Sequence, residues 1–355
     1  MHYDDIEKQN IIKIRALVSE LPSFCKDYFR NIENNTASKT RIAYAGDLNL
    51  FFNFLYKYNP SINKNNISYD TLNSLTYSDI DEYLDYLKFY NNDDKLEISN
   101  TSISINRKLA SLKSFYNYLF NHDLIDNNPT AKIKLSKPKN IVITRLDNDE
   151  VSELLDSVES GINLNKHQIA YHEKNKTRDL AILYLMLGTG IRVSECVNIN
   201  IDDINYKDNA IKIKRKGGKE ALIYFSDEVK EYLLSYHNER KLIIPNSDDD
   251  KAFFLSGQNK RINVRTIQLM VKKYTKNVTP LKKITPHKLR STYGTNLYRE
   301  TGDIYLVANN LGHNDINTTE KHYAAMDEDN RKAARNILKL RRNNKDKNTN
   351  KKNDE

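Results

Sequence analysis

Apolar residues recur every three or four positions along most of this chain, which is the period of an α-helix with one buried face. The pattern is clear from Thr40 onward, where the apolar positions are Ile42, Leu48, Phe51, Phe52 and Leu55. Two more helices are predicted, one from about Ser78 and one from about Asn100 to Asn121. No strand is visible between them, so we predict a small all-helical domain over residues 36–126.

Polar stretches set the borders of this domain. Residues 1–35 have helical periodicity that Pro22 interrupts, so we predict a helical extension ahead of the domain. The stretch from Asn127 to Asn140 has two prolines, four lysines and few large apolar residues, which predicts a basic linker over residues 127–143. Residues 343–355 are polar and of low complexity, and we expect them to be disordered.

Residues 144–342 are predicted to form a second domain, mostly helical with a small antiparallel sheet. Residues 160–177 are polar and predict a loop or a frayed helix. The stretch from Asn209 to Phe225 predicts a β-hairpin with its turn at Gly217-Gly218. The expected helices are Asp149–Val158, Thr177–Leu187, Asp227–Arg240, Val264–Lys276 and Asp327–Leu340. The whole chain therefore falls in a mostly α, α+β class.

Two helix boundaries carry polar residues that suggest chemistry. Gly188-Thr189-Gly190 interrupts an apolar helix without the Gly-Lys-Ser/Thr of a phosphate-binding loop, and a new helix should present Arg192 and Glu195 on one face. Thr285 and Pro286 are typical of a helix start, and His287 and Arg290 then share a face of that helix. His313 follows a second glycine, and Tyr323 comes ten residues later.

The charge of the chain indicates what kind of partner it binds. The net charge is +9 and the isoelectric point is about 9.1, which favours a polyanion. No acidic residue lies between Asp250 and Glu300, and a basic block of that length predicts a surface that follows phosphates. The two cysteines, Cys25 and Cys196, are far apart and no signal peptide or membrane span is visible, so a reducing cytoplasm is expected.

Arginines and histidines near a tyrosine suit phosphoryl transfer. Arg192 and Arg290 could bind the oxygens of a pentacoordinate phosphorus with paired donors, and Tyr323 could attack the phosphorus to form a covalent ester with DNA. His287 is a candidate general base or hydrogen-bond donor, and His313 could bind a phosphate oxygen. Glu195 is expected to orient Arg192 or His287. Neither a nucleotide-binding motif nor a two-metal carboxylate cluster is visible, so no cofactor and no metal are expected.

In this order and spacing, the residues GTGIRVSE from Gly188, the hairpin stretch KGGKEALIYF, and the segment from Thr285 to Ala325 resemble the active site of the tyrosine recombinases, the phage integrase family. The resemblance covers about residues 36–340. It implies that Lys216, at the hairpin tip, is the general acid, and that Tyr323 is joined to a 3′ phosphate while a 5′ hydroxyl leaves. It also implies that the helical domain grips DNA and that four protomers act together on two duplexes.

The resemblance predicts a site-specific recombinase that cuts and rejoins double-stranded DNA without ATP, associated with the nucleoid. In many relatives the tyrosine lies nine positions after the second histidine, a position that His322 occupies here. Tyr323 lies ten positions after His313, a longer gap that some mobile-element integrases share. Tyr293, Tyr298 and Tyr305 are expected to pack in the core instead. The alternatives are a topoisomerase-like or resolvase-like strand transferase, and a DNA-binding relative without catalysis. The sequence does not distinguish chromosome-dimer resolution from phage or transposon integration.

Overall fold

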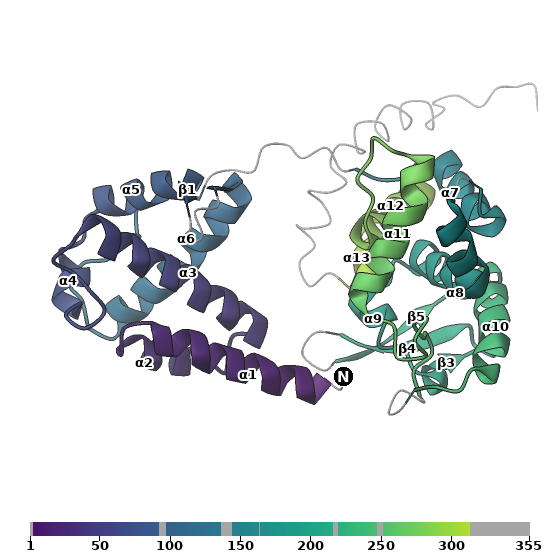
Figure 1. The fold of residues 1–355 in the computed structure, drawn as a ribbon, viewed down its shortest axis with the longest axis horizontal. Helices are drawn as coiled ribbons and strands as arrows, with labels where there is room; N and C mark the ends of the chain where they lie inside the picture. The colour runs from purple at the N-terminus through teal and green to yellow at the C-terminus, as the bar shows by residue number, and fades with distance from the viewer. Residues whose placement is uncertain are drawn as a thin grey trace, which may run out of the picture. The chain divides into compact units, whose positions relative to one another are not determined.

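The computed structural model describes residues 3–91, 97–135, 144–162, 164–215, 219–246 and 251–312. The chain divides between Ile141 and Val142 into two compact units, each with its own hydrophobic core (Figure 1). Both are mostly helical and each contains one small antiparallel sheet, which confirms the predicted fold class. Among the described residues, no helix has the length and apolar content needed to cross a bilayer.

The first unit contains six helices and a short hairpin among its described residues. Its elements are α1 (Tyr3–Glu20), α2 (Cys25–Asn31), α3 (Ser38–Tyr58), α4 (Tyr69–Ser74), α5 (Tyr77–Lys88), β1 (Phe89–Asn91), β2 (Glu97–Ser99) and α6 (Ser102–Asn121). The hairpin, with Tyr90 opposite Ile98, is an addition to the helices that the sequence predicted. Buried residues of α1 and α2 belong to the same core as those of α3 and α6, so these segments form one body.

One boundary in this unit differs from the prediction. The cap of α5 is Thr76 rather than Ser78, because the Asp79 carboxylate accepts the Thr76 backbone N–H at 2.7 Å while the Thr76 hydroxyl accepts the Asp79 N–H at 3.4 Å. This reciprocal pair satisfies two N–H groups that the first helical turn leaves without partners.

The second unit is built around one long helix. Its elements are α7 (Asn148–Ser160), α8 (Lys166–Thr189), α9 (Val193–Cys196), the 3₁₀ turn η1 (Ile201–Asp203), β3 (Ile204–Asn205), β4 (Ala210–Lys214), β5 (Glu220–Tyr224), α10 (Asp227–Leu242), α11 (Val264–Val278), α12 (Pro286–Thr301) and α13 (Ile304–Leu311). Helix α8 packs against α7, α10 and α12 (Figure 1). The three strands pair in the order β3-β4-β5.

The loop or frayed helix predicted for residues 160–177 is largely wrong, because α8 is continuous from Lys166. Asn165 starts it with a capping box, in which the Asn165 side chain accepts the Gln168 N–H at 2.9 Å and Gln168 accepts the Asn165 N–H at 3.0 Å. The polar residues that suggested a loop are partly buried and bonded inside the fold, as described below.

Several predicted features lie outside the described residues. They are the tip of the β4–β5 hairpin at residues 216–218, the second half of the linker at residues 136–143, the helix expected after Tyr323, and the tail at residues 343–355. The hairpin itself is confirmed, with Lys212 opposite Leu222 and Lys214 opposite Glu220.

Candidate active site

A glycine turn carries the chain from α8 to the first candidate arginine. Gly190 ends α8 with φ +63°, a left-handed conformation that favours glycine. A Cβ atom at Gly190 would overlap the Tyr293 ring and would lie 2.9 Å from a methyl carbon of Leu311. Both the backbone angle and the close approach therefore require glycine at this position.

Arg192 follows this turn as the residue that caps α9, not as a residue within that helix as predicted. Its backbone is extended, and the Glu195 carboxylate accepts the Arg192 backbone N–H at 2.9 Å. The second Glu195 oxygen accepts a hydrogen bond from Nη1 of the Arg192 guanidinium, also at 2.9 Å. Glu195 is buried, whereas the Arg192 side chain is 37% exposed. The carboxylate thus holds the arginine at both ends and leaves its guanidinium partly accessible.

The C-terminal end of α13 gathers three guanidinium groups. Arg192 Nη2 donates to the Gly312 carbonyl at 2.9 Å, Arg290 Nη2 donates to the Leu311 carbonyl, and Arg215 Nη2 is 3.5 Å from the Asn310 carbonyl. These three carbonyls are consecutive at the helix end, where unpaired carbonyl groups concentrate partial negative charge. Cationic side chains are therefore favoured there.

Arg290 also joins this helix end to the glycine turn. Its Nη1 donates to the Gly190 carbonyl at 2.6 Å, and the side chain is buried. Arg290 lies on the first turns of α12, which begins at Pro286 after Thr285 as predicted. His287, one turn earlier on the same helix, is exposed. The structure therefore brings Arg192, Glu195 and Arg290 together.

Three predicted site residues, Lys216, His313 and Tyr323, lie outside the described residues. Two of them directly follow described residues of this cluster in the sequence, since Lys216 comes after Arg215 and His313 comes after Gly312. Arg215 itself was missed by the sequence reasoning. Its available signal was its position next to the predicted catalytic lysine, at the end of the first strand of the predicted hairpin.

The described tyrosines of this region differ in exposure. Tyr298 is buried, as expected, and Tyr293 is half-buried against Gly190. Burial raises the pKa of the Tyr293 phenol, and the nearby Arg290 charge opposes this only in part. The core location expected for Tyr305 is wrong, because this residue of α13 is 65% exposed.

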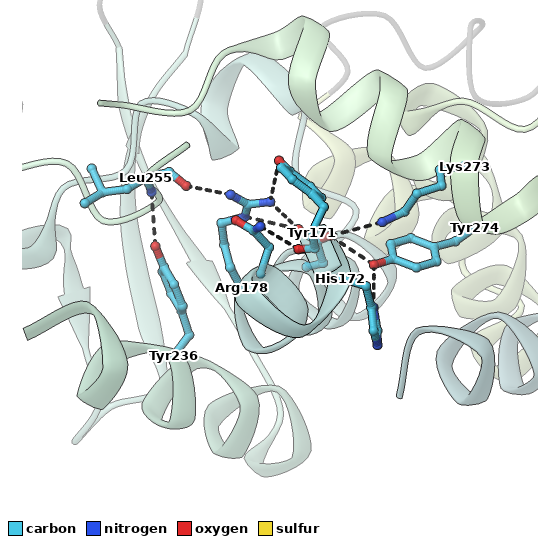
Figure 2. A network of polar contacts seen from close by, with 9 residues as sticks. Tyr171, His172, Arg178, Tyr236, Leu255, Lys273 and Tyr274 are labelled. Carbon is cyan, nitrogen blue, oxygen red and sulfur yellow. Dashed lines mark hydrogen bonds and ion pairs between the residues drawn. The ribbon is translucent and has the colours of Figure 1, made fainter. Parts of the chain in front are cut away.

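A buried polar network fixes the first half of α8 (Figure 2). The Asp179 carboxylate, fully buried, accepts from Arg178 Nη2 at 2.6 Å and from the Tyr274 hydroxyl of α11 at 3.1 Å. Arg178 also donates to the Leu255 carbonyl at 3.0 Å, and the Leu255 N–H donates to the Tyr236 hydroxyl at 3.1 Å. The network therefore ties α8 to α11, to α10 and to the segment around Leu255.

The same network defines the state of His172. The Tyr274 hydroxyl has one proton, which it donates to Asp179, so it accepts a hydrogen bond from His172 Nδ1 at 3.0 Å. Burial lowers the pKa of His172, and the charge of Lys273 lowers it further. Burial also lowers the pKa of Lys273, whose Nζ lies 3.9 Å from an Asp179 oxygen and 3.8 Å from the centre of the Tyr274 ring. The network thus places a proton on His172 Nδ1, and burial disfavours a second proton on the ring.

The acid-free block between Asp250 and Glu300 does not form one surface. Arg261 is half-buried and donates to the Val197 and Ile199 carbonyls, while Lys273 and Arg290 serve the interior contacts described above. The exposed basic residues of the block include a row along α11 at helical spacing, namely Arg265, Lys272 and Lys276. We call this row the α11 basic row.

Comparisons with known proteins follow the same division of the chain. Residues 144–330 match the model of the phage integrase family, and residues 25–122 match that of the phage integrase N-terminal SAM-like domain. Tyrosine recombinase XerC of Caldanaerobacter subterraneus subsp. tengcongensis is 35% identical over 306 residues, covering 83% of this chain and 80% of that protein. Tyrosine recombinase XerS of Streptococcus thermophilus is 31% identical over 352 residues, covering 92% and 98%.

Solved structures share the fold at lower identity. The crystal structure of XerH site-specific recombinase bound to palindromic difH substrate, a post-cleavage complex, matches with a TM-score of 0.65 and 19% identity, covering 85% of this chain and 81% of that one. The Tn1549 transposon integrase in complex with transposon right end DNA matches with a TM-score of 0.61 and 19% identity, covering 88% and 99%.

Proposed function

The chain belongs to the phage integrase family and is a tyrosine-type site-specific recombinase, and from this premise we propose which of its residues cut and rejoin DNA. The observation that carries the proposal is the convergence of Arg192 and Arg290 on the end of α13, directly before His313 in the sequence. Site-specific recombination is favoured over the topoisomerase-like and non-catalytic alternatives, because the curated relatives that cover most of this chain are tyrosine recombinases.

Arg192 and Arg290 are proposed to hold the scissile phosphate. A phosphodiester gains negative charge on its equatorial oxygens as a fifth ligand approaches, and guanidinium groups offer paired donors that stay charged at any working pH. Glu195 is proposed to orient Arg192, which its two hydrogen bonds to that residue support. His287 and His313 are proposed as further donors to the phosphate, with His287 also able to act as general base.

Tyr323 is proposed as the nucleophile and Lys216 as the general acid. The Tyr323 phenolic oxygen gives its proton to the general base, proposed above as His287, and forms a bond to phosphorus, while the bond from phosphorus to the 5′ oxygen breaks. Lys216 gives a proton to that 5′ oxygen, which leaves as a hydroxyl. An unperturbed phenol has a pKa of about 10, so nearby cations must favour the phenolate. A 5′ hydroxyl from the partner strand reverses these steps, and neither ATP nor a metal is required.

The substrate is proposed to be a double-stranded DNA recombination site, bound by both units, with residues 36–126 as the core-binding domain, residues 127–143 as the linker and residues 144–342 as the catalytic domain. Because two duplexes exchange strands, we propose a tetramer in the synaptic complex, made of this chain or of this chain and a related recombinase. The proposed location is the cytoplasm, in association with the nucleoid. The exposed charges of the α11 basic row support this partner.

The nucleophile can be tested on a nicked suicide duplex, from which the leaving fragment diffuses away and traps the covalent complex. Tyr323→Phe should bind the duplex with unchanged affinity and form no covalent complex. Tyr305→Phe is the matched control, because it removes an exposed hydroxyl from α13 and should leave the complex intact. Peptide mapping should place the 3′ phosphate on Tyr323. A modified peptide centred on His322 or on another tyrosine would refute the assignment.

A further inference from the structure

Arg215 is the one arginine of the α13 cluster to which the reaction steps proposed above give no task. It stands at the end of β4, where its backbone N–H donates to the Lys219 carbonyl at 2.8 Å. That bond closes the β4–β5 hairpin next to its tip, one residue before Lys216 in the sequence. Arg215 therefore contacts two parts of the fold. Its backbone is hydrogen-bonded within the hairpin, and its side chain packs on the end of α13.

The Arg215 side chain is held at α13 by shape rather than by strong hydrogen bonds. Its Nη2 lies 3.5 Å from the Asn310 carbonyl, at the outer limit for a hydrogen bond. Its buried Nε has no hydrogen-bond partner among the described residues. A Cβ atom at Gly312 would overlap the guanidinium carbon and Nη1, so the missing side chain of this glycine makes the space that the guanidinium fills. Gly312 also has φ +60°, and glycine serves both needs here.

This packing links two parts of the site that are far apart in the sequence. One anchor, Arg215, directly precedes Lys216, and the other, Gly312, directly precedes His313. An error of about 1 Å in the placement of a catalytic group can slow a reaction about 100-fold. A side chain that fixes the tip end of β4 on the end of α13 is thus placed to set the geometry of proton transfer.

We infer that Arg215 is a positioning residue for strand cleavage, which docks the tip end of β4 onto the end of α13 so that Lys216 can protonate the departing 5′ oxygen. The inference rests on the role proposed for Lys216 above. Arg215 acts through Lys216 and does not contact the phosphate. Its loss therefore affects only a reaction that needs a proton on the leaving group.

The test compares single-turnover cleavage of three nicked suicide duplexes by the full chain. One duplex is unmodified, one has sulfur in place of the scissile 5′-bridging oxygen, and one has a neutral methylphosphonate at the scissile position. Sulfur leaves without a proton, so it bypasses Lys216. The methylphosphonate removes a negative charge, so it relieves the loss of a guanidinium that contacts the phosphate. The variants are Arg215→Ala, Arg215→Lys, Lys216→Ala and, as a control for charge on the same strand, Lys214→Ala, whose side chain is exposed.

Arg215→Ala should bind DNA with unchanged affinity, cleave the unmodified duplex at least about 10-fold more slowly, and recover to within about threefold of the wild type on the sulfur duplex. Arg215→Lys keeps the charge and most of the length of the side chain, so it should cleave the unmodified duplex at a rate between those of Arg215→Ala and the wild type. It serves as the test variant if the alanine variant does not fold. Lys214→Ala should cleave as the wild type does. The double variant lacking both Arg215 and Lys216 should be no slower than Lys216→Ala alone.

Three outcomes would overturn the inference: normal cleavage by Arg215→Ala, slow cleavage on both the oxygen and the sulfur duplex, or recovery on the methylphosphonate duplex, which would make Arg215 a phosphate contact. Lys216→Ala separates this inference from its premise. If sulfur fails to rescue Lys216→Ala, the general acid proposed above is wrong. If sulfur rescues Lys216→Ala but not Arg215→Ala, only the role of Arg215 is wrong.

Discussion

Two glycines end helices of the second unit with nearly the same φ angle but in different surroundings. Gly190, after α8, has φ +63° and Gly302, after α12, has φ +64°. A Cβ atom at Gly190 would meet Tyr293 and Leu311, whereas one at Gly302 would have no atom of the described residues within 4 Å. The pair separates the cost of a left-handed backbone from the cost of crowding at the site.

Gly302→Ala should lower the free energy of unfolding by about 1–2 kcal/mol, the cost of a left-handed alanine. Gly190→Ala should lower the free energy of unfolding by about 1–3 kcal/mol more than Gly302→Ala does, because the added methyl group overpacks the contact with α12 and α13. Urea denaturation of both variants would measure this difference. Equal losses would mean that the site relaxes around Gly190 at no cost.

Helix α8 is the element on which the site depends, since its end delivers the turn that precedes Arg192. The sequence identified its apolar half and its glycine end, but not its polar half. Tyr171 and His172 lay in the predicted loop because their partners, Lys273 and Tyr274, come about 100 residues later in the chain and only the fold brings them together. Arg215 was missed for the same reason, because its contact is with α13.

Asp179→Asn tests the network that holds α8. The change removes the charge that partners Arg178, which is 3% exposed, and leaves a buried guanidinium uncompensated. We expect a loss of about 3–5 kcal/mol in the free energy of unfolding, measured by urea denaturation. Glu220→Gln is the control in the same unit, because its ion pair with Lys212 is exposed and its loss should be negligible. A small effect of Asp179→Asn would show that water or other groups compensate Arg178.

His172 makes this network sensitive to acid. Its pKa in the folded state lies below the ordinary value of 6.5, mainly because it is buried. As the pH falls below about 6.5, the unfolded chain binds a proton that the folded chain does not, so stability decreases until the pH reaches the folded pKa. His172→Asn keeps an N–H donor but does not titrate. Between about pH 7 and pH 5 the wild type should therefore lose more stability than this variant. Parallel curves from urea titrations across this range would contradict the assignment.

At the scale of the whole molecule, each of the two units has its own large hydrophobic core among its described residues, and the net charge of the chain is +9. The sequence predicted this fold class and the site-bearing helices well, because periodicity and helix caps are local signals. Charge was a poorer guide. The sequence cannot show that Arg261, Lys273 and Arg290 point into the catalytic unit, so the basic block overstates the charge available to DNA.

The α11 basic row should account for part of the salt dependence of DNA binding. Each phosphate contact contributes about 0.9 to the slope of log affinity against log salt concentration. Replacing Arg265, Lys272 and Lys276 by glutamine should reduce that slope by about 0.9 for each residue that contacts a phosphate. Lys282→Gln is the control, because Lys282 is already paired with Asp147 and Glu150. An unchanged slope in the triple variant would place the DNA on another face.

The contacts at the end of α13 have a thermodynamic consequence. This helix is held by a small cluster of its own, formed by Tyr298, Val307 and Leu311, and by the donors of Arg192 and Arg290. In the role proposed for Arg192 and Arg290, each donor that turns to a phosphate leaves one carbonyl of the helix end without its hydrogen bond. Docking of α13 and binding of the phosphate would then be linked equilibria. Linkage is reciprocal. The factor by which docking of the helix end weakens phosphate binding equals the factor by which bound phosphate weakens docking of the helix end.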